Sequence, residues 1–104
     1  MSAARERLPN RRHSETFGFE VGSRRYRCTV SKYPDGRIAE LFLNNNKVGS
    51  DCDCAARDSA IVFSIAIQHG VPADVIRKAL LRDSQGRASG PLGAALDLIG
   101  GPAP

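Results

Sequence analysis

Two thiols and two carboxylates occupy four consecutive positions, Asp51-Cys52-Asp53-Cys54. All four side chains can bind metal ions, so zinc is the first chemistry to consider. Tetrahedral zinc is usually held by a Cys-x₂₋₄-Cys pair together with a second pair elsewhere. A Cys-x-Cys pair lacks this spacing, and on a helix its two thiols would lie about 200° apart. We therefore predict no metal ion and no cofactor, and name Cys52 and Cys54 as the candidate ligands to test.

A helix start explains the same residues without a ligand. Ser50 and Asp53 have the spacing of a capping box, with the serine at the N-cap and an acid three residues later. Asp51 adds a second negative charge at the positive end of the helix dipole. These carboxylates would oppose any lowering of a thiol pKa, so a redox-active cysteine is not expected.

Residues for nucleophilic catalysis are few. The chain has no Gly-x-Ser-x-Gly elbow and no cysteine with an evident histidine and acid partner. Its two histidines are His13, near the N-terminus, and His69, at a predicted helix end. The sequence therefore predicts a protein that is not an enzyme.

One interpretation of the residues just before the helix is an anion site. Lys47-Val48-Gly49-Ser50 brings an ammonium group, a flexible turn and a hydroxyl to a helix N-terminus, which is a favourable place for phosphate. The stretch lacks the spacer of a true P-loop, and the two following aspartates would repel a phosphate. The alternative is a plain turn between strand and helix.

Positive charge is concentrated in the first half of the chain. Residues 1–47 hold ten Lys and Arg against five Asp and Glu, whereas residues 48–104 hold five against six. Arg25 and Arg27 should share the outward face of one strand, where they could follow a phosphate backbone. No aromatic side chain is expected on that face for base stacking, so a merely solvated basic face is the alternative. The candidate residues for binding an anion or a partner are Arg25, Arg27, Arg37, Lys47, Gly49 and Ser50.

Alternating apolar residues predict three strands, over residues 16–21, 24–33 and 37–43. Gly22-Ser23 and Pro34-Asp35-Gly36 are short turns, so the strands should form an antiparallel meander. The third strand is apolar on both faces except at Glu40, a pattern that suits a central strand or one covered by helices.

Helices are expected after the sheet. The first runs from Ser50 to a stop at His69-Gly70, the second from Pro72 to Leu80, and the last from Pro91 to Ile99. Val75, Ile76, Ala79 and Leu80 should form the buried face of the second helix. The predicted fold is α+β, a three-stranded antiparallel β-meander followed by two to three helices packed on one face.

The predicted organisation is a flexible basic arm over residues 1–14, a single domain over residues 15–100, and a disordered tail over residues 101–104. No apolar run is long enough to span a membrane, and the N-terminus lacks the apolar stretch of a secretory signal. We therefore expect a cytoplasmic protein whose three cysteines are reduced.

From Pro34 to Leu98 the sequence resembles the TSCPD domain, which occurs at the C-terminus of class II (cobalamin-dependent) ribonucleotide reductases and as small stand-alone proteins. The resemblance rests on Asp35-Gly36-Arg37, on Glu40 to Asn44, on Lys47-Val48-Gly49-Ser50, on the helix from Ala55 to Ile67, and on His69-Gly70-Val71-Pro72. It implies kinship with an appendage of the reductase and none of the reductase's active site.

The motif that names the family is altered in this chain. In place of Thr-Ser-Cys-Pro-Asp stands Ala88-Ser89-Gly90-Pro91-Leu92, which keeps the serine and the proline and lacks the thiol and the acid. We therefore do not expect metal or thiol chemistry from that motif in this chain.

Two functions remain open from the sequence. The first is a non-catalytic accessory or regulatory module that binds a protein partner, such as an enzyme of nucleotide metabolism. The second is a nucleic-acid-binding module that uses the basic arm and the sheet face. Self-association into a homo-oligomer is also expected to be feasible, because a three-stranded sheet has edges to satisfy.

Overall fold

Three antiparallel strands form one sheet in the order β1-β2-β3. A computed structural model describes residues 4–8 and 13–100, with β1 at Ser14–Val21, β2 at Arg24–Lys32 and β3 at Ile38–Asn45. Phe17 pairs with Cys28, which pairs in turn with Leu43, so β2 is central. The predicted meander is confirmed.

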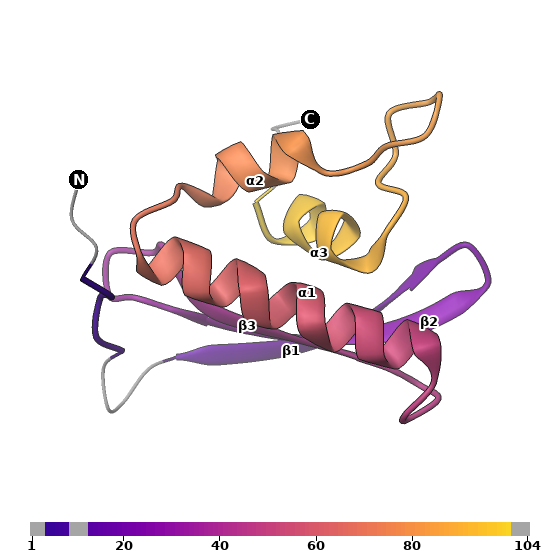
Figure 1. Cartoon of the computed structure of the whole chain (residues 1–104), viewed down its shortest axis with the longest axis horizontal. Coiled ribbons are helices and arrows are strands. Elements are labelled where there is room, and N and C mark those ends of the chain that lie inside the picture. The colour runs from indigo at the N-terminus through magenta and orange to yellow at the C-terminus, as the bar shows by residue number, and fades with distance from the viewer. Residues whose placement is uncertain (1–3, 9–12, 101–104) are drawn as a thin grey trace.

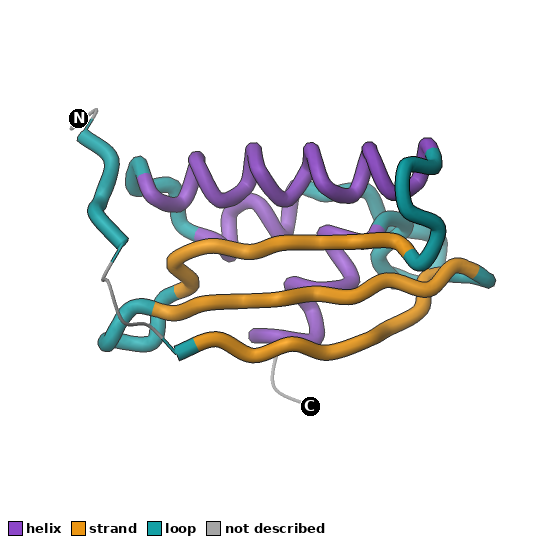
Figure 2. Tube along the Cα trace, turned by 90° about the horizontal axis from the view of Figure 1, so that it is seen from below, coloured by secondary structure: helices purple, strands orange, loops and turns teal. Residues whose placement is uncertain are grey.

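Three helices follow and lie on one side of the sheet (Figure 1). They are α1 at Asp51–Gln68, α2 at Ala73–Ala79 and α3 at Pro91–Gly100. Helix α1 runs along β3, and α3 crosses behind the sheet toward β1 (Figure 2). The α+β prediction, with a β-meander followed by helices, is confirmed.

The core lies between the sheet and α1. Cys28, Leu41 and Leu43 point into it from the strands, and Ala56, Ala60 and Phe63 meet them from the helix. The side chains of the two alanines are single methyl groups, so the helix backbone can approach the sheet closely. Leu92, Ala95 and Leu96 of α3 complete the same cluster.

The apolar residues on both sides of strand β3 have a cause that could be predicted only in part. It is an edge strand and not the central one, but α1 covers it, as the second of the two interpretations expected. On its other side Phe42 stays 47% exposed. The apolar pattern therefore reflects one covered face and one exposed phenylalanine.

The buried face predicted for α2 is wrong in half of its residues. Val75 is 58% exposed and Ala79 is also exposed, whereas Ile76 and Leu80 are half-buried and pack against the core. Helix α2 has only 7 residues and rests mainly on α3, so a single edge of it is covered.

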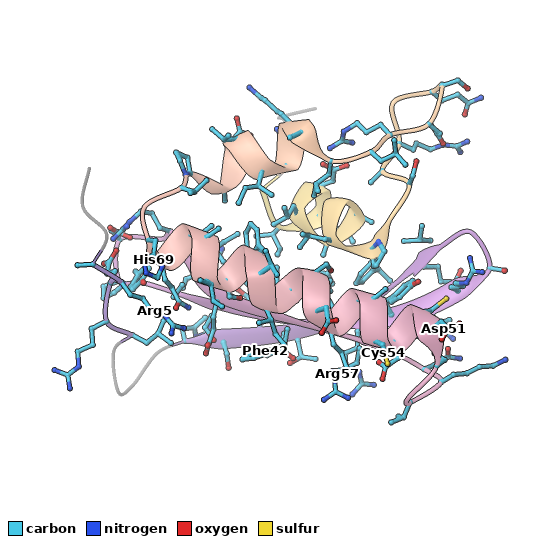
Figure 3. All side chains as sticks on the ribbon, viewed as in Figure 1. Arg5, Phe42, Asp51, Cys54, Arg57 and His69 are labelled. Atoms are coloured by element: carbon cyan, nitrogen blue, oxygen red, sulfur yellow. The ribbon has the colours of Figure 1, made fainter. Side chains whose placement is uncertain are left out.

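Part of the predicted arm contacts the domain at the end of α1. The N–H of Glu6 donates to the C=O of Gln68 at 2.6 Å, and the guanidinium of Arg5 bonds the Gln68 side chain. Figure 3 shows Arg5 and His69 at this same end. Residues 1–3 and 9–12 of the arm and the predicted tail 101–104 lie outside the described residues. Among the helices that are described, none has the length and apolar character needed to cross a membrane.

Candidate functional site

The start of α1 is fixed by the capping residues predicted from the sequence. Ser50 is the N-cap, and its hydroxyl accepts the N–H of Asp53 at 3.1 Å. The same hydroxyl donates to the C=O of Lys47 at 2.7 Å. Gly49 has φ of 80°, a left-handed conformation that favours glycine, and this turns the chain into the helix.

Asp53 bonds two backbone N–H groups of the turn that precedes α1. Its carboxylate accepts the N–H of Asn45 and the N–H of Gly49, each at 2.9 Å, and the side chain is almost fully buried. These backbone N–H donors, with Gly49 foremost, hold the pKa of Asp53 below its ordinary value. Lys47, Gly49 and Ser50 therefore build the turn, and the N–H of Gly49 already has an internal partner.

The two cysteines at the start of α1 diverge. Cys54 is exposed, with its Sγ 3.9 Å from the C=O of Gly49, whereas Cys52 is half-buried beside Tyr26. Within residues 4–8 and 13–100, no group of three or more His, Cys, Asp or Glu side chains is placed to hold a metal ion.

The face of the sheet away from the helices carries two of the predicted arginines. Arg25 and Arg27 both project there from β2, because Tyr26 and Cys28 between and beside them are buried in the core. Gly18 pairs with Arg27 on one side and Asn44 pairs with it on the other. Since Gly18 has no side chain, the surface is hollowed next to Arg27.

We call this depression the arginine hollow. It has a volume of 690 Å³ and is lined by Gly18, Arg25, Tyr26, Arg27, Asn44, Asn45 and Asn46. The loop that closes it is held to β2, because the side-chain amide of Asn45 and the N–H of Asn46 both donate to the C=O of Arg25, at 3.1 and 3.2 Å. The hollow thus combines guanidinium groups with amides on a fixed backbone.

The two arginines of the hollow differ in their partners. Arg25 has its Nε 3.5 Å from Glu20, and both side chains are largely exposed. Among the described residues, no ion pair or hydrogen bond involves the Arg27 side chain. An exposed pair of this kind contributes little, so both guanidinium groups can bind an incoming anion.

Arg37 is not part of the hollow. It follows the far end of β2, roughly 25 Å along the strand from Arg25 at about 3.3 Å per residue. Its guanidinium bonds Glu6 through two hydrogen bonds of 3.0 Å each, bonds Asp35 at 2.7 Å, and lies 4.7 Å from the centre of the Tyr33 ring. The structure therefore separates Arg37 from the other basic candidates and gives it contacts with Glu6, Asp35 and Tyr33.

Phe42 lies on the face of the sheet away from the helices, which we call the open face, and the sequence reasoning missed it. It projects on the side of the sheet away from α2 and α3 (Figure 3). Phe42 pairs with Thr29 of β2, and the hydroxyl of Thr29 lies 3.0 Å from the hydroxyl of Thr16 in β1. The expectation that this face has no aromatic residue is therefore wrong. Alternation with the buried Leu41 and Leu43 was the signal that could have found it.

A family model described as the TSCPD domain matches residues 3–100. The chain belongs to the TSCPD domain family. Its similarity to curated proteins points the same way. It is 44% identical over 73 residues to the vitamin B12-dependent ribonucleotide reductase of Rhodopirellula baltica and 36% identical over 72 residues to that of Agrobacterium fabrum. It is 37% identical over 68 residues to the reductase of Streptantibioticus cattleyicolor.

These matches cover most of the chain and little of the relatives. They span 69%, 69% and 65% of the chain, but only 7%, 6% and 11% of the three reductases. This TSCPD domain therefore corresponds to a small part of a large enzyme. No solved structure matches the chain significantly.

The altered family motif lies beside Cys52. A second hollow, of 400 Å³ and mostly apolar, is lined by Cys52 and Tyr26 on one side and by Ser89, Gly90, Pro91 and Leu92 on the other. A Cβ added at Gly90 would meet nothing within 4 Å. A side chain at the position where the motif has cysteine would therefore fit without a clash in this TSCPD domain.

Proposed function

We propose that this TSCPD domain is a non-catalytic accessory module that binds an acidic surface of a protein partner through the arginine hollow. The observation that carries the proposal is the exposed guanidinium of Arg27, which has no ion-pair partner within residues 4–8 and 13–100 and lies beside the bare backbone of Gly18. A planar guanidinium can bind a carboxylate through two parallel hydrogen bonds, and the exposed side-chain amides of Asn44 and Asn46 add further donors.

Phe42 supplies an apolar contact on the same face. Protein interfaces commonly join a buried aromatic anchor to arginines and a polar rim. Phe42 is two residues from Asn44 on the same face of β3 and pairs with Thr29 of β2. It therefore lies beside the hollow. This combination favours a protein surface over a small inorganic anion as the ligand.

The relatives suggest where such a partner acts. The similar proteins are vitamin B12-dependent ribonucleotide reductases, of which this chain matches one small part. An enzyme of nucleotide metabolism is therefore the partner class that we propose. We further propose that the module works in the cytoplasm, where its three free cysteines would stay reduced.

Charge reversal tests the proposal. Tagged wild-type protein and the double variant Arg25→Glu/Arg27→Glu would be used to capture partners from the native host, and each captured protein would then be titrated in purified form. The double variant Lys78→Glu/Arg87→Glu is the matched control, because it changes the charge equally at exposed residues away from the hollow. We expect a partner that binds the wild type and the control but loses most of its affinity for the first variant. Equal binding of all three would contradict the proposal.

Nucleic acid is the second candidate, and the position of Phe42 favours it. An aromatic ring beside arginines on an open sheet face is an arrangement that can stack a base and hold its phosphates. The test is a titration of generic single-stranded DNA and RNA, followed by fluorescence anisotropy at increasing salt. Binding that weakens steeply with salt and is lost in Phe42→Ala would support this function, and no binding at low salt would exclude it.

A further inference from the structure

The two edges of the sheet differ in whether their outward backbone groups are hydrogen-bonded. Along β3, side chains of α1 bond the backbone groups that face away from β2. Ser64 bonds both groups of Leu41, Asp53 bonds the N–H of Asn45, and Gln68 bonds the C=O of Ala39. Along the outer edge of β1, no described element lies beside the strand, which is the lowest of the three in Figure 2.

The direction of the free groups on β1 follows from that pattern. Leu41 and Asn45 point their N–H groups away from β2, so the residues paired with them, Val30 and Tyr26, must bond toward β1. Their partners on β1 are Glu15 and Phe19. Backbone groups alternate in direction along a strand, so the residues at the other parity direct their N–H and C=O groups outward. These residues are Thr16, Gly18 and Glu20.

We propose that β1 pairs antiparallel with β1 of a second copy of this chain, centred on Gly18, so that two sheets join into one of six strands. This register pairs Gly18 with its own copy as a hydrogen-bonded pair and pairs Thr16 with Glu20 on both sides. Glu15 then faces Val21, and no two like charges oppose each other. The strand is thus complementary to itself in the way that a two-fold interface requires.

Apolar side chains on the helix side of β1 support the same contact. A hollow of 340 Å³ at this edge is lined by Glu15, Phe17, Gly18, Val30, Lys32, Leu98 and Ile99. Leu98 is 62% exposed and Phe17 is half-buried. A two-fold axis perpendicular to the sheet places the helices of both copies on one side, so these apolar surfaces would cover each other. Both arginine hollows would then share the opposite face.

Gly18 allows a direct test of the register. A Cβ added at Gly18 would have one neighbouring atom within 4 Å, the carbonyl oxygen of Tyr26 at 3.8 Å, which is an ordinary contact distance. The φ angle of Gly18 is not positive, so its backbone conformation suits other residues. Gly18→Lys and Gly18→Glu should therefore fold, as circular dichroism would verify. Gly18→Ser is the neutral control.

Sedimentation velocity over a range of concentrations gives the readout. We expect a reversible dimer for the wild type and for Gly18→Ser. Like charges opposed at the centre should raise the dimer dissociation constant of Gly18→Lys and of Gly18→Glu by about fivefold or more. A mixture of the two charged variants should recover the dimer, because opposite charges then meet at position 18.

Proline at an outward position provides an independent test. Thr16→Pro removes an N–H that faces away from β2, so the β1-β2 ladder should persist while pairing with a second copy is blocked. Thr16→Ala loses the same contact with Thr29 but keeps the N–H. The proline variant should dimerise at least about tenfold more weakly than the alanine variant. A wild type that stays monomeric at all concentrations would overturn the proposal, as would a dimer that neither Gly18→Lys nor Thr16→Pro weakens.

Discussion

Ser64 of α1 bonds both backbone groups of Leu41 in β3. Its hydroxyl accepts the N–H of Leu41 at 2.9 Å and donates to the C=O of the same residue at 3.0 Å, and all of these groups are buried. A neighbouring strand would normally make such bonds. The helix side chain thus takes the place of a fourth strand, which keeps β3 from pairing with other chains.

Replacing Ser64 by alanine should destabilise the domain by about 1–3 kcal/mol, because both groups of Leu41 would remain buried without partners. Ser59→Ala is the matched control on the same helix, since the Ser59 hydroxyl bonds only the C=O of Ala56 one turn earlier. Urea denaturation of both variants measures the difference. Equal stability of the two variants would show that the contact with Leu41 contributes nothing.

The sequence could predict α1 and its cap but not its bonding to β3. Asp53 and Ser50 have a local spacing with a known meaning, and the structure confirms their roles at the helix start. Ser64 and Gln68 are ordinary polar residues within a helix by sequence alone. Their partners are backbone groups 23 and 29 residues away, and backbone groups leave no signature in the sequence.

Asp53 should make the stability of the domain depend on pH. Backbone donors lower its pKa in the folded state, so the unfolded chain binds the proton more readily. Its contribution is complete above the unfolded pKa of about 3.9 and is lost as the pH falls through the lower folded pKa. Asp53→Asn should therefore be less stable than the wild type at pH 7 and lose less stability between pH 5 and pH 2.

Denaturation midpoints measured across this pH range provide the check, with Asp51→Asn as control. Asp51 stands at the same helix start but is exposed. Stability curves of Asp53→Asn and the wild type that run parallel down to pH 2 would disprove the assignment.

Asp97 of α3 connects the helices to the loop that follows α2. Its carboxylate accepts two hydrogen bonds of 2.8 Å from Arg82 and one of 3.2 Å from Arg77, and these arginines lower its pKa. Asp97→Asn should loosen this contact and speed amide exchange over residues 73–89 by about fivefold, while the sheet stays protected. Hydrogen exchange followed by mass spectrometry can resolve the segments. Asp58→Asn on α1 should leave the exchange of this region unchanged.

The candidate site could be predicted in part, because alternation along a strand is a local rule. Arg25 and Arg27 lie on the open face as expected, with Tyr26 and Cys28 buried. Arg37 is a candidate of the same basic patch by sequence, but the structure places it elsewhere. Its contacts with Glu6 depend on where the N-terminal segment packs, and no spacing rule predicts a contact 31 residues apart.

Cys28 should be the one unreactive thiol of the three. Its side chain is fully buried between β1 and β3, and this burial raises the pKa of the thiol to about 12. Thiolate is the reactive form, so at pH 8 Cys28 is both protonated and inaccessible. A chromogenic disulfide reagent should therefore label the exposed Cys54 and the half-buried Cys52 in the native protein, and Cys28 only after unfolding.

The variant Cys52→Ser/Cys54→Ser isolates this behaviour, because Cys28 is then the remaining thiol of the chain. Its labelling rate should rise with denaturant in parallel with the unfolded fraction, since access requires separating the strands from α1. Adding the family motif's cysteine by Gly90→Cys in the same variant provides a positive control, because the position is open and a thiol there should react in the native state. Rapid labelling of Cys28 in the folded double variant would mean that the sheet opens far more often than its packing allows.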